Sequence, residues 1–193
     1  MEKIDLIYDH YKTTMDIIAN TEKKRGQLFI YIGVVEIINF MFLIYPSELI
    51  KSLNKYFTAT YNFEVDISIL IIQSAIWIII VYTLLRYYQL NIHIERQYKY
   101  LHLLELNIGN SLSITYFNRE SANYLENFKT ITDVFYIFYT WVIPLLFIVI
   151  NGIKIYYEIK SQISCYWLIF DFICCAFAIG LSILYLYMLH KKK

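Results

Sequence analysis

Glycine, proline and charged residues are scarce in this chain, which has five glycines and two prolines among 193 residues. Charged residues make up 17% of the sequence, whereas hydrophobic residues make up 59% and aromatic residues 19%. Soluble domains carry about a quarter charged residues, so this chain has too little polar surface to face water. The composition excludes collagen-like, linker-rich and intrinsically disordered chains, and it favours a membrane protein.

The motifs of common enzyme and metal sites are also missing. The four histidines and three cysteines show no CxxC pair and no zinc-ligand spacing, and the sequence has no GxGD, GxSxG or HExxH motif. It has no glycine-rich phosphate loop either. Cys174 and Cys175 are adjacent in an apolar run, where we expect them to be packing residues. We therefore expect no enzyme, no metal site and no cofactor.

Four continuous apolar stretches are long enough to cross a bilayer as helices, which takes about 20 residues each. Closed β-barrels instead need strands of alternating polarity, and these stretches do not alternate. The sequence therefore predicts an all-α membrane protein with four transmembrane helices. The predicted spans are residues 27–45, 67–85, 134–153 and 165–189.

Lysine and arginine are distributed unevenly among the segments that connect these spans. Segments 1–26 and 86–133 carry five each and the tail 190–193 carries three, whereas segments 46–66 and 154–164 carry two each. Basic connecting segments stay on the cytoplasmic side of a membrane. We therefore expect both termini and the long middle segment in the cytoplasm, with the other two segments as external loops.

Apolar residues recur at steps of three and four in the more polar segments as well, which predicts helices there. Segment 1–26 has the pattern of an amphipathic cytoplasmic helix, and Gly26 predicts a break before the first span. The apolar pattern of the second span continues far beyond the membrane. One helix covering residues 67–108 would be about 63 Å long at the rise of an α-helix.

Residues that favour turns and helix ends predict where helices begin and end in the middle segment and in the first external loop. Residues Gly109–Phe117 are typical of a turn, and Asn118 is a suitable N-cap for a helix that returns into the third span. Segment 86–133 is therefore predicted to be a cytoplasmic helical hairpin that extends spans 2 and 3. In the external loop, apolar residues after Pro46 predict a short interfacial helix.

Polar side chains inside the spans are the most unusual feature of the sequence. An intramembrane carboxylate is costly unless it is paired, protonated or hydrated. The predicted spans contain no lysine or arginine to pair with Glu36 or Asp171. This favours a proton, a bound cation or a wet cavity at these acids, whereas intramembrane amides can also simply join helices by hydrogen bonds. The polar residues are Glu36, Asn39, Gln73, Asn151 and Asp171.

Helical spacing adds further residues to this group. Asp171, Cys175 and Ser182 share one face of the fourth span, which either lines a pathway or packs against other helices. Pro144 cannot donate a backbone hydrogen bond, so it predicts a kink in the third span that is either static or a gating hinge. The candidate pore and gating residues are Glu36, Asn39, Gln73, Pro144, Asn151, Asp171, Cys175 and Ser182.

A second candidate group lies in the predicted cytoplasmic segments. Basic and aromatic side chains would converge there if the hairpin packs against the N-terminal helix, and such groups hold phosphates and stack bases. Positive-inside anchoring, with tyrosines at the membrane interface, accounts for the same residues. Nearby acidic residues argue against an extended nucleic-acid groove, so the ligand would be small or short. The basic residues are Lys23, Lys24, Arg25, Arg86, His93, Arg96, Lys99 and Arg119.

Two stretches carry a resemblance to known membrane proteins. The opening helix YDHYKTTMDIIANTEKKRGQLFI leads into the first span, and FNRESANYLENF precedes the third. In this architecture the chain resembles small four-span membrane effectors of bacterial anti-phage defence, such as Hailong-type channel effectors. The resemblance implies an oligomeric pore in the bacterial inner (plasma) membrane, controlled by a nucleotide or nucleic-acid signal.

Two functions therefore stay open from the sequence. The first is a homo-oligomeric ion channel or pore, such as a tetramer, that is gated through its cytoplasmic helices. Symmetry would repeat a carboxylate around its axis and so favour cations. The second is a non-conducting membrane adaptor or sensor whose cytoplasmic hairpin recruits a soluble protein partner.

Overall fold

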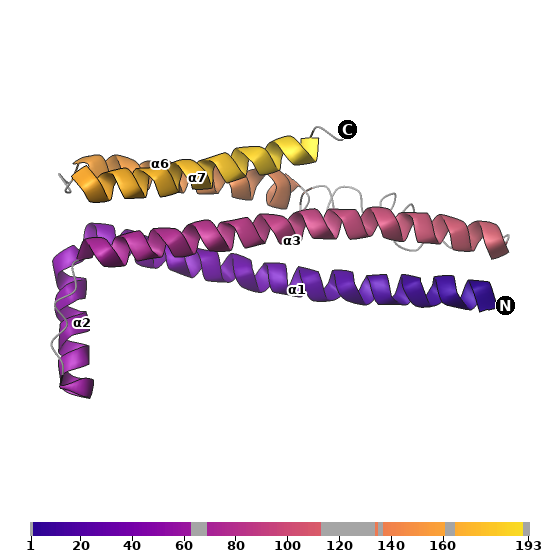
Figure 1. Cartoon of the computed structure of the whole chain (residues 1–193), viewed down its shortest axis with the longest axis horizontal. Helices are drawn as coiled ribbons and strands as arrows, with labels where there is room; N and C mark the ends of the chain where they lie inside the picture. The colour runs from indigo at the N-terminus through magenta and orange to yellow at the C-terminus, as the bar shows by residue number, and fades with distance from the viewer. Residues whose placement is uncertain (1, 63–68, 113–133, 135–136, 161–164, 191–193) are drawn as a thin grey trace. The chain divides into compact units, whose positions relative to one another are not determined.

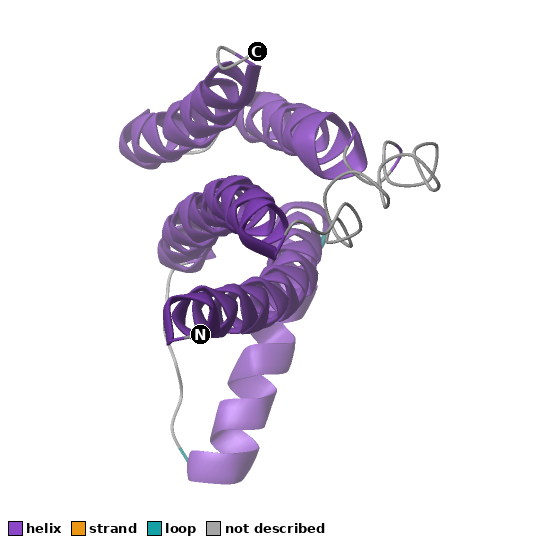
Figure 2. Cartoon of the chain, turned by 90° about the vertical axis from the view of Figure 1, so that its right-hand side faces the viewer, coloured by secondary structure: helices purple, strands orange, loops and turns teal. Residues whose placement is uncertain are grey.

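A computed structural model describes residues 2–62, 69–112, 134, 137–160 and 165–190. All of the regular structure in these residues is helical, as the purple ribbons of Figure 2 show. The elements, labelled in Figure 1 except for η1, are α1 (Glu2–Ile44), α2 (Pro46–Tyr61), α3 (Ile69–Leu112), the π-helical turn η1 (Phe138–Val142), α6 (Ile143–Lys160) and α7 (Cys165–His190).

Four stretches of helix in the described part of the chain are long and apolar enough to cross a membrane. They lie in α1, in α3, in η1 together with α6, and in α7. The all-helical fold with four candidate spans is therefore confirmed. With 43 and 44 residues, α1 and α3 are about twice as long as a bilayer requires.

The chain divides into two compact units, and both α1 and α3 contribute to each of them. Unit 1 comprises Met1–Leu28 and Tyr87–Ile143, and unit 2 comprises Phe29–Arg86 and Pro144–Lys193. Unit 1 therefore holds the amphipathic halves of α1 and α3. Unit 2 holds their apolar halves together with α2, α6 and α7.

In unit 1, α1 packs against α3 through pairs that mix a tyrosine and a carboxylate. The Tyr11 hydroxyl donates to Glu105 Oε1 at 3.4 Å, and the Tyr98 hydroxyl donates to Glu22 Oε1 at 3.2 Å. The later residue of α1 meets the earlier residue of α3, so the two helices are antiparallel here. The apolar stripes predicted from the sequence supply the buried side chains, which include Ile18, Ile94, Leu101 and Ile108.

Two predicted breaks lie inside helices instead. Gly26 is an interior residue of α1, and the helix continues through it. Residues Gly109, Asn110 and Ser111 belong to α3, where the Ser111 hydroxyl donates to the Asn107 carbonyl at 2.8 Å. Packing of the buried stripes outweighs the weak helix propensity of these residues. The remainder of the predicted turn and the return helix lie outside the described residues.

The third span differs most from its prediction. The helix does not end at residue 153 but continues to Lys160. A π-helical turn, η1, ends two residues before Pro144, and the Ile143 N–H bonds to the Phe138 carbonyl there. Such single wide turns are common where a helix accommodates a local defect. The fourth span agrees with α7 within one residue.

A helix is present where the sequence predicts one after the first span: α2 has 16 residues and no buried side chain. Figure 1 shows it leaving the end of α1 crosswise. Leu49 and Leu53 of α2 pack against the apolar core that α1 and α3 form in unit 2. The helix ends at Asn62, whose left-handed backbone (φ 52°) lets its N–H bond to the Thr58 carbonyl.

Replacing Gly26 by alanine should stabilise the protein. An added Cβ would meet no atom within 4 Å, and a mid-helix glycine costs about 0.5–1 kcal/mol relative to alanine. Thermal unfolding of the purified protein in detergent should show a higher midpoint for Gly26→Ala and a much lower one for Gly26→Pro. A lower midpoint for the alanine variant would mean that the chain bends at this glycine.

A buried polar cluster as candidate functional site

Unit 2 holds four charged side chains in its interior. Glu36 on α1 is 4% exposed, Asp171 on α7 is 2% exposed, and Lys154 and Glu158 on α6 are fully buried. All four come from helices that are long and apolar enough to cross a membrane. We call these residues and the polar side chains that they contact the polar cluster.

The polar cluster is built on one face of α6. Asn151, Lys154 and Glu158 follow each other at steps of three and four, which places them in line along the helix. Phe147 continues the same buried face toward the start of α6. This face continues about two turns beyond residue 153, where the predicted span ends.

Lys154 is held by an anion and an aromatic ring. Its Nζ lies 3.1 Å from Glu158 Oε1 and 4.0 Å from the centroid of the Trp77 ring on α3. The Trp77 Nε1–H donates to the same Glu158 oxygen at 3.3 Å. Lys154 is the one basic residue among the buried side chains of the described residues. The ammonium group is therefore the positive centre of the cluster.

Asn151 connects three helices. Its Nδ2 donates to Glu36 Oε1 on α1 at 3.2 Å and to the Phe147 carbonyl on α6 at 2.8 Å. Its backbone carbonyl faces the Cys175 thiol of α7 at 3.6 Å. Asn39, one turn after Glu36, is fully buried, and its amide group has no hydrogen-bond partner within the described residues.

The predicted polar face of α7 is the face that is buried in unit 2. Asp171 accepts a hydrogen bond from the Ser74 hydroxyl of α3 at 2.9 Å. Further along, the Ser182 hydroxyl donates to the Ala178 carbonyl at 3.0 Å. Every candidate pore residue is buried in unit 2, and these are Glu36, Asn39, Gln73, Pro144, Asn151, Asp171, Cys175 and Ser182.

The spans predicted from the sequence contain no basic residue, whereas the third candidate span in the structure, Phe138–Lys160, includes Lys154. The predicted third span ends at residue 153, one residue before this lysine. The spacing of Lys154 and Glu158 could have identified them, since a pair four residues apart on a helix is set to form an ion pair. No pattern in the sequence identifies Trp77 and Ser74 as members of the polar cluster.

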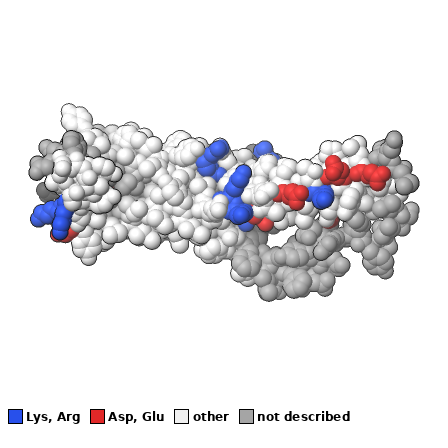
Figure 3. Space-filling model, turned by 90° about the horizontal axis from the view of Figure 1, so that it is seen from below, with Lys and Arg blue, Asp and Glu red and all other residues white. Residues whose placement is uncertain are grey.

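The polar cluster contains more acids than bases. Three carboxyl groups surround one ammonium group, so the cluster has a formal charge of −2 when every member is ionised. Such an excess within lipid depth requires protons, a cation or water. Figure 3 shows charged side chains at its left end, where α2 lies, and a broad white surface next to them.

The candidate basic residues do not form one site in the described part of the chain. Arg25 donates to Asn91 Oδ1 at 3.4 Å, and its guanidinium carbon lies 4.3 Å from the centroid of the Tyr139 ring. Arg119 lies outside the described residues, and Arg86 belongs to unit 2. The members of this candidate group whose side chains are exposed are Lys23, Lys24, Arg86, His93, Arg96 and Lys99.

Comparison with known proteins adds no family to these observations. No protein-family model matches the chain, and neither the curated proteins nor the solved structures contain a similar protein. The resemblance to anti-phage effectors therefore stays a prediction, and function is inferred from the chemistry of the polar cluster.

Removing the ammonium group should destabilise unit 2 strongly. Lys154→Met leaves three buried carboxyl groups without a cation, and breaking a buried ion pair on one side costs about 3–5 kcal/mol. The double variant Lys154→Met/Glu158→Gln should recover most of this loss, because glutamine is neutral and still accepts the Trp77 hydrogen bond. Unfolding in mixed detergent micelles measures both variants.

Lys160→Met is the matched control, since Lys160 is exposed at the end of the same helix. It should unfold like the wild type. A Lys154→Met variant as stable as this control would mean that the buried pair contributes nothing to stability.

Proposed function

We propose that this chain is a multi-pass membrane protein that conducts small cations through the interior of unit 2. The supporting observation is the polar cluster, in which Glu36, Lys154, Glu158 and Asp171 are all at most 4% exposed within candidate spans. Ionisable residues at such depth are rare and typically belong to ion or proton pathways. The excess of acidic groups favours cations over anions.

The proposed route runs inside each subunit. A ring of carboxylates around an axis between subunits would need acids on the outer surface of one chain, whereas Glu36 and Asp171 are buried within it. A homo-oligomer, such as a tetramer, would then carry one route in every subunit. This replaces the ring expected from the sequence.

An apolar layer next to the polar cluster is the proposed gate. The helices α1, α3 and α6 each carry a buried apolar residue about one turn from a cluster residue, in the direction of the residues that the helix contributes to unit 1. Narrow apolar layers stop ions because water leaves them, and a small widening restores the flow. The proposed layer consists of Ile32, Ile80 and Phe147.

Unit 1 is the proposed control element. The helices α1 and α3 run without interruption from unit 1 into unit 2. A ligand that moves their unit 1 halves would therefore act on Glu36 and Trp77 along the same two helices. In the proposed orientation, both termini and unit 1 face the cytoplasm of a bacterium, and the ligand is a nucleotide or short oligonucleotide.

Neutralising the acids should reduce conduction. In liposomes with a K⁺ gradient, Glu36→Gln and Asp171→Asn should each lower cation flux by about tenfold or more, which corresponds to about 1.4 kcal/mol of barrier. Their preference for cations over anions should fall in parallel. Glu48→Gln is the control, because Glu48 is an exposed acid on α2.

Absence of flux from the folded wild-type protein in every ligand and voltage condition would contradict conduction. The function left would be the non-conducting adaptor, with unit 1 as the surface that recruits a soluble protein partner. Flux that is unchanged in both acid variants would instead place the route elsewhere.

The basic residues of unit 1 give a separate prediction. If they bind a regulatory phosphate ligand, changing Arg96, Lys99 and Arg119 together to glutamine should abolish control while flux itself and oligomer size persist. Binding of a panel of nucleotides and short oligonucleotides in nanodiscs measures this. Lys51→Gln/Lys55→Gln, on α2, is the control, because it removes two exposed positive charges outside unit 1. Regulation that survives the triple change would leave these residues as membrane anchors.

A further inference from the structure

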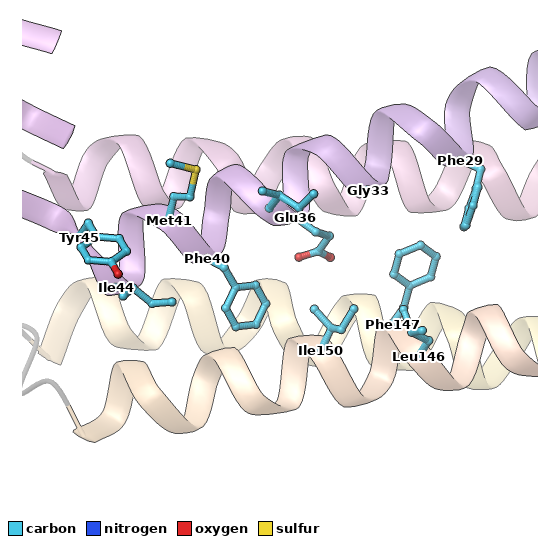
Figure 4. Close-up of a pocket in the computed structure, with 11 residues that line it drawn as sticks. Phe29, Gly33, Glu36, Phe40, Met41, Ile44, Tyr45, Leu146, Phe147 and Ile150 are labelled. Carbon is cyan, nitrogen blue, oxygen red and sulfur yellow. The ribbon is translucent and has the colours of Figure 1, made fainter. Parts of the chain in front are cut away.

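Unit 2 has a groove between α1 and α6 whose lining side chains are apolar except for Glu36 and the hydroxyl of Tyr45. Its volume is about 460 Å³, within the range of sites that hold drug-sized molecules. Eleven residues line it, and Glu36 is the one charged residue among them. Figure 4 shows the Glu36 carboxylate turned from α1 toward α6, close to Ile150 and Phe147.

The two oxygens of the Glu36 carboxylate differ in their contacts. Oε1 accepts the hydrogen bond from Asn151 at 3.2 Å. Oε2 has no hydrogen-bond partner within the described residues, although the side chain is only 4% exposed. Leaving a buried acceptor without a donor is unfavourable, and more so when it carries charge. The groove therefore offers an acceptor to whatever fills it.

The walls of the groove restrict the chemistry of that donor. The mostly apolar side chains on both helices offer a hydrated metal ion few further oxygen ligands from the walls. Phe40 and Phe147 flank the carboxylate in Figure 4, and aromatic rings attract organic ammonium groups. A carboxylate next to aromatic rings, in a mostly apolar groove, is complementary to a hydrophobic molecule with one positive charge.

We propose that the groove binds a lipophilic monoamine, whose ammonium group donates to Glu36 Oε2 while its apolar body lies between α1 and α6. A neutral lipid tail would fill the same walls but would leave the Glu36 oxygen without a donor. The site does not depend on conduction, because it needs only the groove and the carboxylate.

A pair of rigid probes that differ in one group tests the proposal. 1-Aminoadamantane carries an ammonium group, and 1-hydroxyadamantane is neutral and of nearly the same shape. Binding to the full chain in nanodiscs, measured by calorimetry, should favour the amine by about tenfold or more. Glu36→Gln should remove this preference. Asp171→Asn should keep it, because Asp171 belongs to the same cluster but does not line the groove.

A second variant fills the groove without touching the polar cluster. Gly33 lines the groove, and an added Cβ there meets no atom within 4 Å, so Gly33→Leu should fold and occupy the space. Both probes should then bind about tenfold more weakly or not at all. Gly180→Leu is the matched control, because Gly180 on α7 has the same open surroundings and lies outside the groove.

Three results would overturn the proposal. Equal binding of the two probes to the wild type would identify a groove for neutral lipid tails. A preference for the amine that persists in folded Glu36→Gln protein would remove the role of the carboxylate. Unchanged binding to Gly33→Leu would place the probes elsewhere on the protein.

Discussion

The ion pair between Lys154 and Glu158 is the interaction on which the arrangement of unit 2 depends. The pair is fully buried, and Trp77 contacts both of its members. The ring of Trp77 lies against the Lys154 ammonium group, and its Nε1–H donates to Glu158. In helices of this apolar character, an isolated charge would be too costly to keep. The ammonium group of Lys154 therefore lowers the free-energy cost of burying the three carboxyl groups that α1, α6 and α7 place in the interior of unit 2.

The two units differ in where they place polar and charged side chains. Unit 2 buries the four charged side chains of the polar cluster and leaves large apolar side chains such as Ile37, Ile78 and Phe172 exposed, which suits a surrounding of lipid. Unit 1 pairs its polar groups along α1 and α3, as in a water-soluble antiparallel helix pair. Both helices are continuous and contribute residues to each unit.

Predictions from residue spacing were correct for properties that depend on a single helix. The four apolar runs predicted the candidate spans because bilayer thickness sets a minimum length for any helix. The period of the α-helix placed Asp171, Cys175 and Ser182 on one face. Local signals failed at Gly26 and at residues 109–111, because a weak helix former costs less than the packing of a whole stripe provides.

Residue patterns along the chain are enough to establish that it is helical, where its apolar spans lie and which of their faces carry polar groups, since these properties follow from neighbours three or four residues apart. Which polar groups meet is known only from the packing of the helices. Ser74 and Asp171 are 97 residues apart, and Glu36 and Asn151 are 115 apart. Helical periodicity contains no information on such pairs, because they depend on how separate helices pack and rotate against one another.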